Sequence, residues 1–194
     1  MADTKISAMP SASTLTGAEL VPLVQGGVNV QTDLDSVKTF INKAYGAWHS
    51  TADQTGSTSA GTAMTFNVQD VTDSVTLVSG SRLTVPVDGV YNLQFSSQFE
   101  NTDNAQQDVT IWIKVNGTDV AASASQVTVP ARKSASIYGY SLPAWNWFLD
   151  MNAGDYVEIY WVTTSTLVSM QALPASVSPA YPSIPSVIVT IAQV

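Results

Sequence analysis

The chain has 194 residues, which is the length of one ordinary domain with room for a small appendage. Hydrophobic residues make up 45% of the chain and charged residues only 11%, so Ser, Thr, Asn and Gln must cover much of the surface. The net charge of −8 with scattered Lys and Arg excludes a basic nucleic-acid surface, and the absence of cysteine excludes disulfides and thiolate metal sites.

The first 45 residues differ in pattern from the rest and are predicted to form a separate N-terminal module. Ile6, Ala8 and Met9 form a small apolar cluster before Pro10 and are expected to lie in an extended arm. Residues 19–25 and 28–31 read as two strands, because both are rich in apolar and β-branched side chains. The Gly26-Gly27 pair between them is a hairpin turn signal.

A short helix is predicted to follow the hairpin. Thr32 or Asp33 is suited to cap its first turn, because a hydroxyl or carboxylate oxygen can accept from the free N–H groups there. The helix is about three turns long and would be marginal alone, so it must pack on the hairpin, the main domain or another chain. The apolar stripe expected along it consists of Leu34, Val37, Phe40, Ile41 and Ala44.

From residue 46 to residue 194 the sequence is a series of short alternating runs separated by Gly, Pro, Asn and Asp. Side chains on a strand alternate between its two faces, so such runs indicate strands with one buried face and one wet face. We therefore predict an all-β domain over 46–194, an antiparallel sandwich or barrel. The side chains expected in its core include Tyr91, Leu93, Phe95, Val109, Ile111, Ile113, Val115, Val157, Ile159, Trp161, Val187, Val189 and Ile191.

Several large side chains fall on the strand faces opposite these apolar rows. A lone exposed aromatic needs no explanation, but several could form a contiguous patch that marks an interface. A second packed layer would account for them equally well, and the sequence leaves both readings open. The four candidates for a subunit interface are Trp112, Tyr156, Tyr160 and Ile188.

Catalytic chemistry finds little support in the sequence. His49 is the single histidine, and no nucleophile motif lies near it, so a structural role is expected for it. Aspartate pairs that could serve glycoside hydrolysis all lie at predicted turns, where Asp is favoured for local hydrogen bonding. We therefore predict no catalytic residue, no cofactor and no metal site. The pairs are Asp70 with Asp73, Asp103 with Asp108, and Asp150 with Asp155.

Two binding alternatives stay open beside the plainer readings. The loop over residues 100–108 carries Asp and Asn oxygens that could bind calcium, but it lacks the EF-hand spacing and reads more simply as a solvated loop. Trp145 and Trp147 could form a carbohydrate platform, although packing in a core or an interface explains them more simply.

The order of motifs in the C-terminal part resembles that of C1q/TNF-like jelly rolls. VPVDGVYNLQFSS resembles the hairpin entry of that family, and VTIWIKVNG resembles the strand and Asn-Gly hairpin that follow. FLDMNAGDYVEIYW and PSVIVTIAQV resemble its last two core strands, whereas residues 173–185 depart from the pattern and are expected to form a surface loop. The resemblance implies a ten-strand jelly roll over residues 46–194 that assembles as a trimer.

The N-terminal part is similar to N-terminal segments of tailed-bacteriophage virion proteins. There the pattern ISALP…LTG.EL.P.VQGG precedes a fibre, spike or decoration domain, and residues 5–41 match it nearly without gaps. The resemblance implies a front end that attaches to the particle. The side chains that it offers for attachment are Ile6, Met9, Leu20, Val24, Leu34, Val37, Phe40 and Ile41.

Together these resemblances imply a non-enzymatic virion component. The main hypothesis is a trimeric capsid decoration or head-fibre protein, bound through residues 1–45 to the major capsid protein or another virion structural protein. The alternative is a tail-associated receptor-binding fibre or spike tip that recognises a host surface glycan or protein, with loops near 101–107, 144–147 and 176–183. The N-terminus reads poorly as a signal peptide and no apolar run reaches membrane-span length. We therefore expect synthesis in the host bacterial cytoplasm, incorporation into the virion, and no membrane insertion.

Overall fold

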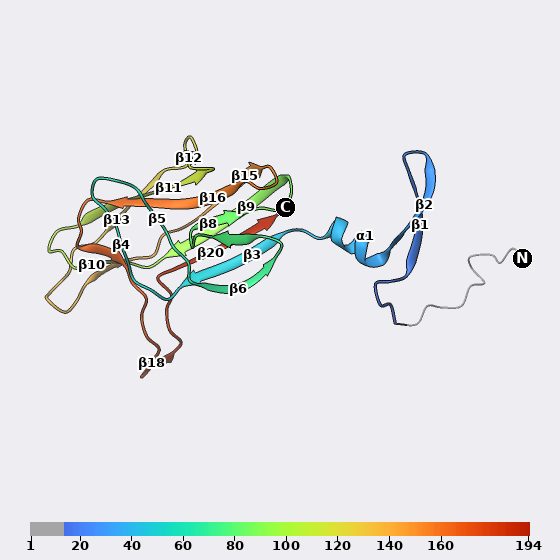
Figure 1. Cartoon of the computed structure of the whole chain (residues 1–194). Coiled ribbons are helices and arrows are strands. Elements are labelled where there is room, and N and C mark those ends of the chain that lie inside the picture. Colours follow the sequence, from blue (N-terminus) through green and yellow to red (C-terminus); the bar gives the residue numbers. More distant parts are fainter. Residues whose placement is uncertain (1–13) are drawn as a thin grey trace, which may run out of the picture. The chain divides into compact units, whose positions relative to one another are not determined.

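The computed structural model describes residues 14–194, and the chain divides after Asn42 into two compact units (Figure 1). Nearly all regular elements are antiparallel β-strands, and α1 (Leu34–Ile41) is the single helix of the described residues. The expectation of an all-β antiparallel protein with a small N-terminal hairpin and a short helix is confirmed. Within residues 14–194 no helix has both the length and the apolar character needed to cross a lipid bilayer.

The N-terminal unit contains one β-hairpin. Strand β1 (Leu20–Gln25) pairs with β2 (Val28–Asp33) over their whole lengths, with Gln25 opposite Val28. Gly26 and Gly27 form the two-residue turn and both have positive φ, which glycine adopts without a steric cost. The Gly-Gly signal therefore predicted the turn correctly.

The helix α1 follows β2 directly. Asp33 is its N-cap, and the Asp33 carboxylate accepts a 2.6 Å hydrogen bond from the Ser36 N–H. The backbone becomes extended at Asn42, so the helix has eight residues and is shorter than the three turns expected. The prediction that Ala44 continues the apolar stripe is wrong, because Ala44 lies beyond the helix and is buried in the C-terminal unit.

The C-terminal unit, residues 43–194, is a β-sandwich with two main sheets. The first sheet is five-stranded, and its two edges are β15 and β6. Strand β9 pairs with β15 and with β20, and β20 also pairs with β3, and none of these three pairings contains a register shift. In spatial order its members are β15 (Ala144–Met151), β9 (Gly89–Ser97), β20 (Val187–Gln193), β3 (Tyr45–Ser50) and β6 (Val68–Asp73).

The second main sheet has seven members, built around the long pair of β11 and β16. Several of its strands are only two or three residues long and extend the edges of this pair. They are β12 (Thr118–Asp119), β11 (Gln107–Val115), β16 (Tyr156–Thr163), β8 (Arg82–Thr84), β7 (Thr76–Val78), β13 (Ser125–Val129) and β5 (Thr62–Ala63).

Two smaller sheets complete the unit at the end opposite the chain entry (Figure 1). A four-stranded sheet closes the sandwich there, and a two-stranded hairpin projects from it. The four strands are β14 (Gly139–Ser141), β10 (Phe99–Asn101), β17 (Val168–Met170) and β4 (Gln54–Thr55), and the hairpin is β18 (Ser176–Val177) with β19 (Ala180–Tyr181).

The strand order is that of a jelly roll. Strands β3, β20, β9 and β15 lie in one sheet, and β8, β16, β11 and β13 lie in the other, so the chain passes repeatedly between the two. Strands β8 and β9 are in different sheets, so the turn at Pro86–Gly89 carries the chain across the sandwich. The hairpin expected at this point is therefore wrong, because β8 and β9 do not pair with each other and instead form a corner between the two sheets.

The core lies between the two main sheets, and the alternating runs predicted it well. Ile111, Val157 and Leu93 are fully buried, as are the other predicted members apart from Val115, which packs half-buried against the same cluster. Side chains that the alternation did not single out fill the remaining space. They include Trp48, Met64, Phe66, Phe99 and Met170.

Candidate functional site

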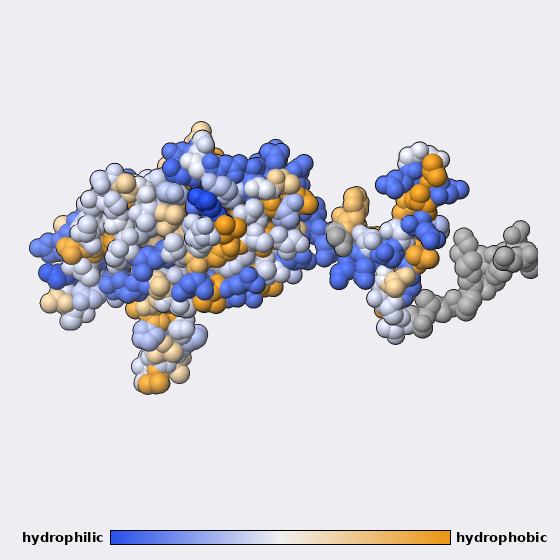
Figure 2. Space-filling model, in the orientation of Figure 1, coloured by the Kyte–Doolittle hydropathy of each residue, from blue (hydrophilic) through white to orange (hydrophobic). Residues whose placement is uncertain are grey.

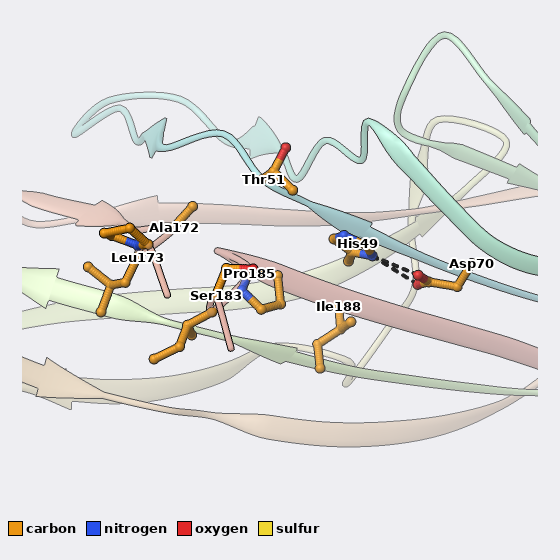
Figure 3. A pocket seen from close by; sticks show the side chains of 10 residues that line it. His49, Thr51, Asp70, Ala172, Leu173, Ser183, Pro185 and Ile188 are labelled. Carbon is orange, nitrogen blue, oxygen red and sulfur yellow. Dashed lines mark hydrogen bonds and ion pairs between the residues drawn. The ribbon is translucent and has the colours of Figure 1, made fainter. Parts of the chain in front are cut away.

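His49 pairs with Asp70 across strands β3 and β6. The His49 Nδ1 atom lies 2.9 Å and 3.0 Å from the two Asp70 carboxylate oxygens (Figure 3). The pair borders an open hollow that also contains Thr51 and Ser183 and the apolar side chain of Ile188. Asp73, the expected partner of Asp70, instead accepts a hydrogen bond from the Ser74 hydroxyl. The structure therefore gives Asp70 a histidine partner, and not the second carboxylate that a glycosidase pair needs.

The other predicted aspartates hold turns together. The Asp155 carboxylate accepts hydrogen bonds from the Asn116 amide at 2.7 Å and the Asn152 N–H at 2.8 Å, and these contacts lower the pKa of Asp155. Asp108 accepts from the Thr128 hydroxyl at 2.7 Å. Only the bond from the Asn152 N–H is the local turn contact expected of Asp, whereas the bonds from Asn116 and Thr128 join segments distant in the sequence.

The loop considered for calcium is fastened by hydrogen bonds of its own. The Asn101 side-chain amide donates to the carbonyls of Ala105, Val129 and Pro130, and the Asp103 carboxylate accepts from the Gln107 amide at 2.8 Å. No group of three His, Cys, Asp or Glu side chains able to hold a metal ion occurs within residues 14–194.

Trp145 and Trp147 face the core and do not form an outward platform. Both lie on the same face of β15, and each ring centre is 5.5 Å from that of Phe95, with Trp147 stacked on it. They are half-buried and pack against the core cluster. This arrangement matches the plainer packing interpretation and leaves no open pair of aromatic faces for a sugar.

Three of the four interface candidates meet on the outer face of the seven-stranded sheet. Trp112 lies opposite Tyr160 with ring centres 5.8 Å apart, and the Lys114 ammonium sits 4.7 Å from the centre of the Tyr160 ring. The indole N–H of Trp112 donates to Asp119 at 2.7 Å, and the Arg82 guanidinium covers Tyr156. These half-buried rings are thus already packed by neighbours of the same chain.

Ile188, the fourth candidate, lies on the outer face of the other sheet, so the structure does not bring the four together. Its side chain is 43% exposed, and it stands among exposed apolar side chains that sequence reasoning did not select. The three central strands of this sheet, β9, β20 and β3, contain no Asp, Glu, Lys or Arg. Its outer face carries the exposed side chains of Tyr45, Val71, Val90, Phe148 and Ile188.

The N-terminal unit exposes four of the eight residues predicted for attachment. Leu20 is 63% exposed and Phe40 is 90% exposed, and Val24 and Ile41 are also exposed. Leu34 and Val37 are half-buried. Ile6 and Met9 lie outside the described residues. The exposed set thus provides apolar contact area, and Leu15, Leu23 and Val28 enlarge it.

No residue between 14 and 42 whose burial is described is buried. The open groove between the hairpin and α1 has a volume of about 460 Å³ and is lined by Leu23, Val30, Val37 and Phe40 among others. Two-stranded hairpins and two-turn helices are marginally stable in water without a packed core. The apolar side chains of this unit therefore lack the covering that stabilises such elements elsewhere.

Specific hydrogen bonds nevertheless define the shape of the N-terminal unit. Glu19 accepts bonds of 2.8 Å from the Thr16 N–H, the Thr16 hydroxyl and the Gly17 N–H. These bonds, the Thr16 N–H foremost, lower the pKa of Glu19 to about 2. A Cβ atom at Gly17 would collide with the carboxylate of Asp35, and Gly17 has a positive φ. Glu19 and the Thr16-Gly17 pair thus form a bracket that joins the start of β1 to the start of α1, and we call it the Glu19 bracket.

The comparisons with known proteins do not supply a family. No protein-family model matches the chain, and no curated protein matches it significantly in sequence. The fold itself is clear: the chain is an all-β protein with a jelly-roll-like sandwich and a hairpin-helix unit at its front. Its candidate functional surfaces are two, the uncovered apolar side chains of residues 14–42 and the outer face of the five-stranded sheet, whose three central strands carry no Asp, Glu, Lys or Arg.

Proposed function

We propose that this protein is a structural component of a tailed-bacteriophage particle that attaches through its N-terminal unit. The observation that carries the proposal is a unit with defined turns and caps but no buried residue among those whose burial is described. Apolar side chains as exposed as Leu20 and Phe40 gain about 25 cal/mol per Å² when a partner covers them. The likeness of residues 5–41 to virion-protein front ends supports the same role.

Four of the residues that carry this likeness shape the unit. Gly17 and Glu19 form the Glu19 bracket, and Gly26 and Gly27 form the hairpin turn. The pattern thus specifies a scaffold that presents apolar side chains, which is what an attachment module needs. The partner proposed for it is the major capsid protein or another structural protein of the virion.

The C-terminal sandwich is proposed as the displayed part, assembled as a homotrimer. The outer face of the five-stranded sheet is the self-association surface, because its three central strands lack Asp, Glu, Lys and Arg, while its acidic groups Asp70 and Asp150 lie on the edge strands β6 and β15. In a chain with a net charge of −8, copies can approach closely only where acidic groups do not face each other. A decoration or head-fibre role is favoured over a tail role, because the display domain follows the attachment unit at once and residues 14–194 contain no coiled coil that could form a shaft.

Attachment is tested by removing residues 1–42 and measuring how much protein copurifies with the particle. We expect the truncated chain to keep the circular-dichroism spectrum of a β-sandwich and to lose binding. Truncation after Asn42 spares Lys43 and Ala44, which bond to Val194 and Gln193 at the end of the last strand. Retained binding would refute the assignment of attachment to this unit.

The trimer is tested by measuring the mass of the full chain in solution at micromolar concentration. A mass of three chains is expected, and it should fall to one chain when Ile188 and Thr190, both on the outer face of β20, are replaced by Asp. The matched control places Asp at Thr110 and Val162 on the other sheet, which should leave the mass unchanged. A monomeric wild-type chain would contradict the proposed assembly.

A receptor-binding role is the second candidate, and the hollow beside His49 favours it. Its lining combines the imidazole, the Thr51 and Ser183 hydroxyls and the Asp70 carboxylate with the apolar Ile188, a mixture that suits a sugar (Figure 3). A glycan array with the purified protein tests this role. Binding that His49→Ala and Asp70→Ala abolish would support it, and no binding to any glycan would set it aside.

A further inference from the structure

The segment between β17 and β20 forms a projecting hairpin, which we call the 173–184 hairpin. Its base is closed by reciprocal backbone hydrogen bonds, Leu173 N–H to Ile184 at 2.8 Å and Ile184 N–H to Leu173 at 2.9 Å. Strands β18 and β19 pair farther out, with Val177 opposite Ala180. The hairpin stands away from both main sheets (Figure 1). Its two levels of pairing hold the tip at a defined distance from the sandwich.

The tip of this hairpin is apolar and uncharged. Val177 is 95% exposed and Tyr181 is exposed beside it, and apolar colouring marks the tip in Figure 2. No Asp, Glu, Lys, Arg or His occurs between Ile159 and Val194. Covering the exposed Val177 side chain with a partner would remove apolar surface from water, which is favourable.

A receiving groove of matching character lies on the outer face of the five-stranded sheet. It has a volume of about 310 Å³, and its lining contains no charged side chain. The groove runs between β9, β20 and the start of β15, where side chains alternate between apolar and neutral polar. The lining includes Gln94, Ser96, Ala144, Ile188 and Thr190.

The base of the hairpin and the groove lie at the same end of the five-stranded sheet. Val187, the first residue of β20 after the hairpin, pairs with Ser97, and Ala144 pairs with Ser96. The hairpin therefore leaves the sheet at the end where the groove lies. Identical copies close into a ring only if the projecting part and its receiving part sit at one level along the axis, since any offset generates an open helix.

We propose that the 173–184 hairpin of one copy docks its Val177 tip into this groove on the next copy. The inference rests on the self-association in the proposed function and adds a head-to-tail contact that closes the ring. The net charge of −8 argues against an anionic membrane or a nucleic acid as the occupant, because the tip offers no cation to either. A second copy meets the tip with a surface that is equally free of charge.

Engineered cysteines test the contact, because the chain contains none of its own. One tagged chain carries Val177→Cys and a second, differently tagged chain carries Gln94→Cys, and the two are coexpressed and oxidised. We expect disulfides between the two tags and none between chains with the same tag. Any such bond must join two copies, because each chain holds a single thiol. Same-tag disulfides through Gln94→Cys, or no disulfide at all, would overturn the proposal.

A charge at the tip gives the second test. Val177→Asp should raise the dissociation constant of the assembly at least tenfold, because the docked carboxylate would lose its water. Val87→Asp is the matched control, since Val87 is exposed on a different loop, and it should leave the constant unchanged. If the assembly persists and Val177→Asp has no effect, the hairpin contact is overturned and self-association stands. If the wild-type chain is monomeric, both are overturned, and hairpin-dependent glycan binding would identify a different occupant.

Discussion

The two units of this chain differ in how they treat their apolar side chains. The C-terminal unit buries large apolar side chains from two facing sheets, and Leu83, Ile111 and Trp161 are fully covered. The N-terminal unit has strands, a capped helix and the Glu19 bracket, yet none of its side chains whose burial is described is buried. The geometry of the N-terminal unit is thus defined by hydrogen bonds, whereas the geometry of the C-terminal unit is defined by packing.

The difference indicates the source of the stabilising free energy of each unit. Burial of apolar surface is the main favourable term in folding, and hydrogen bonds exchanged with water add little net free energy. The sandwich can therefore be stable alone, whereas the hairpin and helix need a surface supplied from outside the unit. Stability and attachment should accordingly respond to different substitutions.

The largest effect separates two leucines with the same substitution. Leu83→Ala, in the core, should lower the free energy of unfolding of the sandwich by about 2–5 kcal/mol because it leaves a cavity. Leu20→Ala, at a position 63% exposed, should change it by less than about 0.5 kcal/mol. Denaturant unfolding followed by tryptophan fluorescence measures both. Equal losses for the two variants would break the comparison.

The second prediction reverses the ranking when attachment is measured. Leu20→Ala should weaken particle binding at least tenfold, because covering a leucine side chain contributes about 1.5–3 kcal/mol. Leu142→Ala removes the same side chain from a 64% exposed site in the sandwich and should leave binding unchanged. Equilibrium binding of the purified variants to particles that lack the protein provides the measurement. Loss of particle binding with Leu142→Ala alone would mean that the sandwich, and not the N-terminal unit, makes the attachment.

The third prediction concerns the start of α1. Asp33→Ala removes the acceptor for the Ser36 N–H, so the first turn should open more often and its amides should exchange roughly fivefold faster. Asp33→Asn keeps an acceptor at the same place and serves as the control. Hydrogen exchange by NMR reports these amides directly. Unchanged exchange in the alanine variant would show that the cap does not hold the helix.

The smallest effect is a pH dependence confined to the N-terminal unit. The pKa of Glu19 is lowered to about 2 from its usual 4.5, chiefly by the Thr16 N–H. A lowered folded-state pKa gives stability that is complete above about pH 4.5 and is lost as the pH falls toward 2. The Glu19 carboxyl carbon in NMR should titrate near pH 2, and Glu19→Gln should remove the dependence. Titration at the usual value would mean that the Glu19 bracket does not form.

Much of the fold was predictable because strand periodicity records burial. The alternating rows in β9, β11, β16 and β20 predicted their core faces, since each packs one face against the opposite sheet. Strand β6 shows no such alternation, because VQDVTD pairs only with β3 at the sheet edge and carries polar groups on both faces. Alternation weakens where a strand has little to pack against.

The strand partners were less predictable than the strands. A Pro-Gly turn signal is the same for a hairpin and for a crossover, so it could not tell that β8 and β9 lie in different sheets. The sequence likewise predicted large side chains on outer faces without showing that Trp112 and Tyr160 cover each other while Ile188 lies elsewhere. Such pairings depend on register between distant segments, which no local pattern encodes.

Helical spacing and the hairpin pattern were enough to locate the apolar side chains of the N-terminal unit, of which Leu20, Val24, Phe40 and Ile41 are exposed. The 173–184 hairpin was not predicted, because a proline-rich stretch without alternation is typical of a loop. Its paired strands and its exposed Val177 emerge only in three dimensions. A surface formed by a proline-rich segment is therefore identified only from the structure, whereas surfaces on segments with clear strand or helix periodicity can be predicted from the sequence.

Hydrogen exchange of the full chain, free in solution and bound to the particle, tests the central claim most directly. The amides of β1 and β2 should exchange rapidly in the free protein and become strongly protected on the particle, while those of β11 and β16 stay protected in both states. Protection of β1 and β2 in the free protein that does not change on the particle would contradict the account.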